Sequence, residues 1–261
     1  MGSPPRGAPA RAGVTTPAFP LRTLTGEADR LGLALDDRAH DRFERYLELL
    51  GEWGPRAGLT AITDRDEVQR RLFGESLSLL VVLRGAGVLG SERTGVVDIG
   101  AGAGIPGLPM RIADPSLRLT LLESNARRCR FLETVVAELR LDGVSVVCAR
   151  AEEAGRDPAL RTAFDLAVAR AVAPLPVLVE YALPLLRPGG VLAAPKGSRA
   201  ESELRDAAAA MAALGGEAEA SLPLSLPTDA PPQQVLLVRR TGDLDERYPR
   251  RPGMPSKRPL S

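Results

Sequence analysis

The fold and the ligand of this chain are restricted most by residues 96–107, VVDIGAGAGIPG. They form a short apolar run through Asp98 that leads into four closely spaced glycines, Gly100, Gly102, Gly104 and Gly107. Glycine lets the backbone turn sharply and approach a ligand with no Cβ in the way. Pro106 lies where the next helix is expected to begin, a position that proline favours. The segment predicts a strand, a turn that binds a nucleotide or nucleoside, and a helix.

Composition restricts the class of protein in which this turn occurs. The chain has 261 residues, 44% hydrophobic and 26% charged, as in ordinary globular proteins. It shows neither an apolar run of about 18 residues, the length of a membrane span, nor a secretory signal. We therefore expect a cytoplasmic protein with no membrane partner. A net charge of +1 argues against a globally basic nucleic-acid binder, so any RNA contact would use local patches.

Cysteine and histidine usage excludes several chemistries. Cys129 and Cys148 fit no metal spacing, and we expect reduced thiols, with Cys129 on the core face of a helix. His40 is the only histidine, which argues against a Ser-His-Asp triad, a Cys-His dyad and a histidine zinc site. No metal is expected.

The chain divides into four predicted regions. They are a disordered tail over 1–20, a helical extension over 21–92, an α/β domain over 93–241 and a basic, proline-rich tail over 242–261. Within the extension, apolar residues at helical spacing predict one helix around 43–50. A second is expected from Asp66 to about Leu83, with Thr63 or Asp64 as its N-cap.

From about residue 95 the pattern alternates between strands and helices. Strands are predicted at 95–100, 117–124, 144–149, 163–171 and 191–197, and helices at 107–114, 125–141 and 174–186. A turn is expected at 187–190, and 233–241 is a candidate edge strand, with an antiparallel direction as one option. Such alternation predicts a Rossmann-like, mostly parallel, doubly wound sheet.

Two ligands fit the glycine loop. Glu123 closes the second strand about 20 residues on, where a carboxylate meets ribose hydroxyls. Gly102, Gly104 and Gly107 match the dinucleotide pattern, so an NAD-linked oxidoreductase is the alternative. Asp98 would repel a pyrophosphate and attract an ammonium, and no group for hydride chemistry is evident. The comparison favours S-adenosylmethionine (SAM), although Asp98 could simply cap the turn.

The order of glycine loop, acidic strand end and LRPGGVL turn (186–192) resembles class I SAM-dependent methyltransferases. Further segments resemble one family, the small-subunit ribosomal RNA methyltransferase G family (glucose-inhibited division protein B). They are DIGAGAGIPGLP (98–109), ARAEE (149–153), ARAVAPL (169–175), PKG (195–197) and YPRRPGMPSKRPL (248–260). The resemblance covers about residues 40–260. It implies a seven-stranded sheet and methylation of N7 of a guanosine in 16S rRNA.

The resemblance also implies site residues. Those expected to bind SAM are Asp98, Gly100, Gly102, Ile105, Glu123, Ala151, Glu152 and Arg170. Glu123 would meet the ribose, and Ala151 with Glu152 the adenine, although Glu152 could instead be a solvated acid. Arg170 or Lys196 would orient the substrate, because an arginine fork suits guanine N7 and O6. N7 carries no proton, so no general base is required, and no catalytic residue is assigned.

The N-terminal part departs from the family pattern. Relatives usually carry W-N-x-x-x-N-L-T and H-x-x-D-S, whereas here Gly54 and Gly58 replace the asparagines, Leu72 the histidine and Glu75 the aspartate. These departures bear on the target nucleotide and on the level of activity.

The expected partner is 16S rRNA or the small ribosomal subunit, bound by a monomer. The basic cluster at 247–258 is the predicted RNA grip, unless that tail packs against the sheet. A second basic patch at 127–130 could equally be solvated surface. Other hypotheses are a methyltransferase with a different acceptor and a SAM-binding assembly module without turnover.

Overall fold

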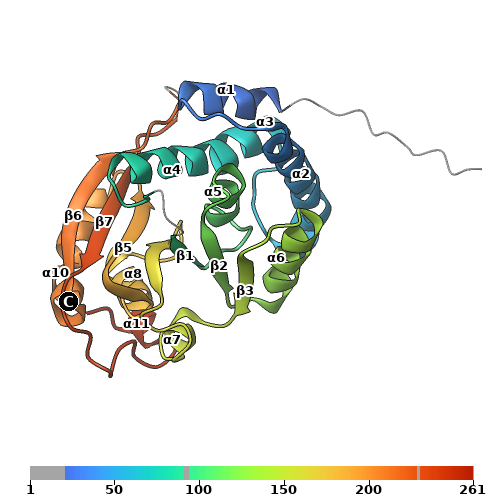
Figure 1. The fold of residues 1–261 in the computed structure, drawn as a ribbon. Coiled ribbons are helices and arrows are strands. Elements are labelled where there is room, and N and C mark those ends of the chain that lie inside the picture. Colours follow the sequence, from blue (N-terminus) through green and yellow to red (C-terminus); the bar gives the residue numbers. More distant parts are fainter. Residues whose placement is uncertain (1–20, 91–93, 228–229, 261) are drawn as a thin grey trace, which may run out of the picture.

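The computed structural model describes residues 21–90, 94–227 and 230–260, so the predicted disordered tail at 1–20 lies outside the described residues. A seven-stranded sheet forms the centre, in the order β3-β2-β1-β4-β5-β7-β6 (Figure 1). Strands β1 to β5 run parallel, and β7 is antiparallel to both β5 and β6. The bounds are β1 Gly95–Ile99, β2 Arg118–Glu123, β3 Val144–Cys148, β4 Phe164–Val168, β5 Leu186–Lys196, β6 Gly216–Pro223 and β7 Gln234–Arg240.

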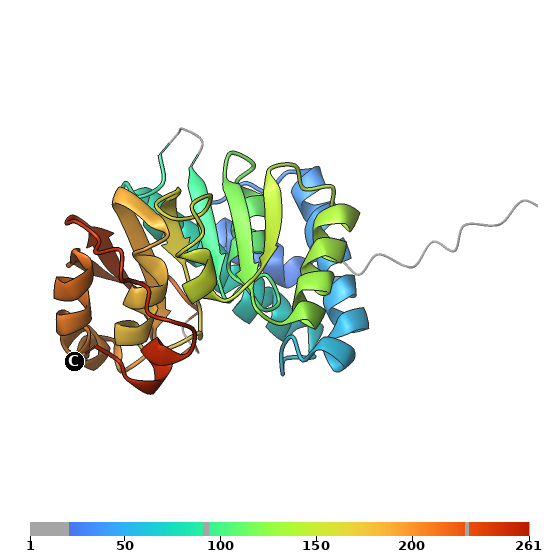
Figure 2. The ribbon, with the colours of Figure 1, turned by 90° about the horizontal axis from the view of Figure 1, so that it is seen from below.

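Helices cover both faces of the sheet, as the alternating pattern predicted (Figures 1 and 2). On one face lie α5 (Gly107–Ala113) and α6 (Ala126–Glu138). On the other lie α7 (Ala151–Ala154), α8 (Leu175–Ala182), α9 (Ala200–Asp206), α10 (Ala208–Leu214) and α11 (Met254–Lys257). Side chains alternate along β1, since Val96 joins the first core and Val97 the second. The predicted doubly wound sheet is confirmed.

The N-terminal helices wrap around α5 and α6 (Figure 1). They are α1 (Arg22–Arg30), α2 (Asp37–Ala57) and a continuous stretch made of α3 (Arg65–Glu67), a π-helical turn (Val68–Gly74) and α4 (Glu75–Gly85). Asp64 is the N-cap, accepting the Glu67 N–H at 2.9 Å. Both predicted helices are therefore present.

Phe43 and Tyr46 of α2 pack on the Phe73 ring, with centroids 5.1 and 5.2 Å away. All three side chains are fully buried, in the same core as β1, α5 and α6.

Two predictions of element boundaries and one of a strand's position in the sheet were wrong. The helix predicted to residue 186 ends at Ala182, and the predicted turn at 187–190 belongs to β5, which is irregular opposite β4 between Phe164 and Leu166. Strand β7 is antiparallel as suggested, but it is not at the edge, because β6 pairs with its outer side. The glycine and alanine residues of β6 gave no strand pattern in the sequence. The strand forms because β6 pairs with β7.

The expectation of reduced thiols was also wrong. Cys129 and Cys148 form a disulfide, with Cα atoms 5.8 Å apart. Cys148 ends β3 opposite Glu123 of β2, and Cys129 lies in the first turn of α6, which follows β2. The βαβ crossover therefore brings the two residues together. Cys129 is buried, as predicted.

Membrane-spanning and metal-binding features are lacking over residues 21–90, 94–227 and 230–260. No helix there combines the length and apolar character needed to cross a bilayer. Nor does that part of the chain gather three His, Cys, Asp or Glu side chains into a group that could hold a metal ion.

Because the N-terminal helices share a core with the sheet, we expect the protein to unfold in one cooperative transition. Trp53 of α2, the single tryptophan, lies 5.9 Å from the Phe131 ring of α6 and reports on that interface. In a urea titration, tryptophan fluorescence and far-UV circular dichroism should share one midpoint.

Phe73→Ala should shift both midpoints together, at a cost of about 3–5 kcal/mol for truncating a buried aromatic side chain. A fluorescence transition that preceded the loss of circular dichroism would instead show that 21–92 unfolds as a separate unit.

Candidate nucleoside-binding site

The glycine loop leaves the carboxyl end of β1 and is tied to β2. The N–H groups of Gly100 and Ala101 both donate to the Leu122 carbonyl, at 2.8 and 3.0 Å. Gly100 has φ +66°, and a Cβ there would lie 2.9 Å from the Val172 side chain. The loop thus holds a left-handed turn that a larger residue would strain and crowd.

Asp98 lies beneath the loop on the α5 side. Its Oδ2 accepts the Gly107 N–H at 2.9 Å, at the first residue of α5. Oδ1 is buried with no hydrogen-bond partner among the described residues. Burial raises the pKa of Asp98 to about 7, and the nearby Glu123 charge adds to the rise, whereas the Gly107 bond opposes it. Asp98 thus anchors the start of the helix.

Glu123 holds the loop from the end of β2. Its Oε2 accepts the Gly102 N–H at 2.9 Å, and its Oε1 accepts the Asn125 N–H at 2.8 Å. The first N–H of α5 and one loop N–H are therefore occupied by carboxylates. Dinucleotide sites use such N–H groups for the pyrophosphate, so this arrangement disfavours NAD.

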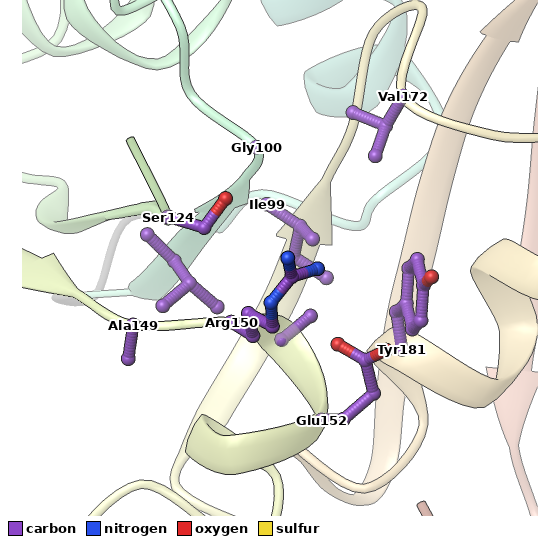
Figure 3. A pocket seen from close by; sticks show the side chains of 10 residues that line it. Ile99, Gly100, Ser124, Ala149, Arg150, Glu152, Val172 and Tyr181 are labelled. Atoms are coloured by element: carbon purple, nitrogen blue, oxygen red, sulfur yellow. The ribbon is translucent and has the colours of Figure 1, made fainter. Parts of the chain in front are cut away.

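Two cavities meet at Gly100. The first, of about 190 Å³, is shown in Figure 3 and is lined by Ile99, Gly100, Leu122, Ser124, Ala149, Arg150, Ala151, Glu152, Val172 and Tyr181. The second, of about 290 Å³, is lined by Leu59, Thr60, Leu72, Gly100, Ala101, Gly102, Ala103, Ile105, Arg128, Arg170 and Ala171.

Most of the residues predicted to bind SAM lie in these two cavities. Ala151 and Glu152 line the first, and Gly102, Ile105 and Arg170 line the second. Asp98 and Glu123 are not lining residues but hold the loop between the cavities through its N–H groups.

Arg170 lines the second cavity and forms an ion pair with Glu75. Its Nη2 lies 2.7 Å from Glu75 Oε2 on α4. Its Nη1 is buried with no hydrogen-bond partner among residues 21–90, 94–227 and 230–260. Burial lowers the pKa of Arg170, and the Glu75 charge opposes that shift. Glu75, one of the departures from the family pattern, is thus the partner of Arg170.

Two other departures also fall at this site. Gly58 is the left-handed C-cap of α2, with φ +58°, a conformation that asparagine also tolerates. Its carbonyl accepts Arg128 Nη2 at 3.0 Å, while Arg128 Nε is buried without a partner in the described parts of the chain. Leu72 lines the second cavity.

Lys196 is not among the residues that line either cavity. Its Nζ lies 2.7 Å from Glu203 Oε2 and donates to the Ala173 carbonyl at 2.8 Å. The Leu175 N–H also donates to Glu203, at 2.9 Å. Lys196 and Glu203 therefore support the loop that carries Val172 and Ala171. A substrate-orienting role for Lys196 stays a prediction.

Glu152 is not a solvated acid. It is 3% exposed, and its Oε1 accepts the Gly253 N–H at 2.8 Å. The same C-terminal stretch holds Arg250, whose guanidinium pairs with the buried Glu180 at 2.6 Å. The alternative in which the tail packs against the body of the protein therefore describes this stretch.

Sequence reasoning missed three residues of the site. Tyr46 looked like an ordinary core residue, yet its hydroxyl donates to the Ala103 carbonyl in the glycine loop. Tyr181 gave no signal apart from helical spacing, and Arg128 was part of a basic run that could have been solvated. Only the contact of α2 with the loop and the position of α8 beside the first cavity reveal the first two.

The strand order, the glycine loop at the end of β1 and the acid at the end of β2 define a class I SAM-dependent methyltransferase fold. A family model described as GidB, rRNA small subunit methyltransferase G, matches residues 39–227. The chain belongs to this rRNA small subunit methyltransferase G family.

Individual relatives can be aligned with this chain over nearly its whole length. A ribosomal RNA small subunit methyltransferase G of Acetivibrio thermocellus is 39% identical over 242 residues, which cover 92% of this chain and 97% of the relative. Its counterpart in Roseiflexus castenholzii is 43% identical, with 88% and 95% covered. A crystal structure of a Corynebacterium glutamicum protein has a TM-score of 0.52 at 21% identity, covering 85% and 97%, and shows likeness of fold alone.

The raised pKa of Asp98 predicts how stability depends on pH. Because the folded-state pKa of about 7 exceeds the ordinary 3.8, the carboxyl contributes most favourably at low pH. This contribution falls as pH rises through 4 to 7, by about 4 kcal/mol in all.

Asp98→Asn should remove this dependence, so its Tm relative to wild type should be higher at about pH 8 than at about pH 5. Thermal denaturation at fixed ionic strength measures the difference. The same Tm difference at both pH values would contradict the assignment.

Proposed function

We propose that this chain is a SAM-dependent methyltransferase that methylates N7 of a guanosine in 16S rRNA. The observation that carries the proposal is the pair of cavities joined at Gly100, one lined in part by Glu152 and Tyr181 and the other in part by Arg128 and Arg170. Its partner would be the small ribosomal subunit or its RNA, with the protein acting as a monomer in the cytoplasm. Family membership supports the choice of rRNA.

The charges of the two cavities fit the two ends of SAM. Glu152 and Tyr181 offer hydrogen-bonding groups at the first cavity, where adenosine would bind. Glu123 stands between the lining residues Leu122 and Ser124 and has acceptor capacity left for ribose. At the second cavity, the buried Nε of Arg128 is without a partner in the described residues. Such a donor suits a carboxylate, which the methionine end supplies.

When bound, SAM supplies an electrophilic methyl group on a sulfonium. The protein has to align the acceptor and exclude water, because guanine N7 has a free lone pair and no proton to lose. Glu75 orients the Arg170 guanidinium through the contact of its Oε2 with Arg170 Nη2, at 2.7 Å. The free edge of that fork would hold guanine O6 and N7, an acceptor pair that arginine reads well.

Gly100→Ala should weaken binding of S-adenosylhomocysteine (SAH) about tenfold or more, because its Cβ would meet Val172 at 2.9 Å beside both cavities. Gly143→Ala is the matched control: Gly143 has φ +72° and open space around its Cβ position. Isothermal titration calorimetry measures both. Equal SAH affinity in the two variants would remove the loop from the cofactor site.

Methyl transfer is tested with radiolabelled SAM and small subunits from a strain that lacks the protein, followed by mapping of the labelled nucleotide. We expect label at N7 of one guanosine of 16S rRNA. Label elsewhere, or on another acceptor, would overturn the proposal.

Arg170→Gln should lower kcat about tenfold or more at saturating SAM, because its charged fork orients the substrate. Arg187→Gln removes an exposed arginine whose partner is Asp165 near the start of β4, and should leave the rate unchanged. Full activity of Arg170→Gln would exclude Arg170 from orienting the guanine.

A further inference from the structure

The C-terminal strap, defined as residues 247–258, lies against α7 and α8 (Figures 1 and 2). Tyr248 is buried in the second core, and its carbonyl accepts Arg161 Nη1 at 2.8 Å. The Arg247 carbonyl accepts Arg156 Nη2 at 3.0 Å. The strap is thus a packed part of the domain.

One buried ion pair anchors the strap. Glu180 of α8 is fully buried, and its carboxylate accepts hydrogen bonds from three donor groups of Arg250. The donors are the Arg250 backbone N–H at 2.8 Å and its Nε and Nη2 at 2.9 and 2.6 Å. The enclosed Glu180 carboxylate holds its partner firmly, because no water can take the place of the arginine. The Arg250 side chain is itself 24% exposed, and its backbone N–H, Nε and Nη2 all donate to Glu180.

Beyond this anchor, the strap touches two residues of the first cavity. The Gly253 N–H donates to Glu152 Oε1 at 2.8 Å, and Ser256 Oγ lies 2.8 Å from the Tyr181 hydroxyl. Figure 3 shows Glu152 and Tyr181 next to each other at one side of the cavity. Gly253 has φ +81°, so the strap turns there in a left-handed conformation.

We propose that the strap is a positioning element of the cofactor site, which holds Glu152 and Tyr181 in place for the adenine end of SAM. This inference rests on the proposed function. The strap bonds to a buried acid on α7 and to a tyrosine on α8, and so fixes the position of one relative to the other. Pre-positioned side chains bind more tightly because less freedom is lost on binding. Arg251, Lys257 and Arg258 of the strap are exposed, so the RNA grip at 247–258 stays a prediction beside this role.

The test compares SAH affinity by isothermal titration calorimetry in the full chain and its variants. The double variant Glu180→Leu with Arg250→Met replaces the anchor by apolar groups and touches no cavity residue. We expect its Kd for SAH to rise about tenfold, with the KM for SAM rising similarly and kcat at saturating SAM changing less than about twofold. Lys257→Met removes an exposed cation of the same strap and should leave the Kd unchanged.

A second comparison decides the matter should the double variant fail to fold. Gly253 and Gly143 both have positive φ and open space at the Cβ position. Gly253→Ala should weaken SAH binding, and Gly143→Ala should not. If wild type binds SAH and Gly253→Ala binds equally well, the strap has no positioning role. If wild type itself does not bind SAH, the proposed function fails, and this inference fails with it.

Discussion

Two carboxylates under the glycine loop organise the rest of the structure. Asp98 fixes the first residue of α5, and Glu123 fixes the loop at Gly102. Together they hold the turn at the carboxyl ends of β1 and β2, the edge where open α/β sheets bind ligands. Without these bonds, glycines at positive φ would leave the loop free to sample many conformations. The two cavities depend on this one rigid turn.

The surrounding elements support the loop from three sides. Tyr46 reaches it from α2, and the Glu75–Arg170 pair joins α4 to the segment after β4. Lys196 and Glu203 hold the following loop, which carries Val172. The N-terminal helices are therefore part of the site as well as of the core. Three of the departures from the family pattern, Gly58, Leu72 and Glu75, lie in this part of the site.

The sequence predicted what depends on local pattern and failed where distant segments meet. The glycine loop, the acid ending β2 and the strand–helix alternation were readable because spacing alone specifies them. Strand β6 was not readable, since its glycine and alanine residues acquire strand geometry only by pairing with β7. The contact of Cys129 with Cys148 and that of Gly253 with Glu152 are set by chain topology, which no local window contains. Roles for individual site residues stay predictions.

The occupied N–H groups of the loop have a consequence for discrimination among metabolites. Adenine nucleotides and dinucleotides share the adenosine half of SAM, so a pocket that recognised adenosine alone would be filled by them. Here Asp98 and Glu123 have already taken the amides that a phosphate would seek, and the Glu123 carboxylate repels a phosphate that approaches the loop. The same bonds that make the turn rigid thus act as a selectivity filter against the phosphorylated relatives of the proposed ligand.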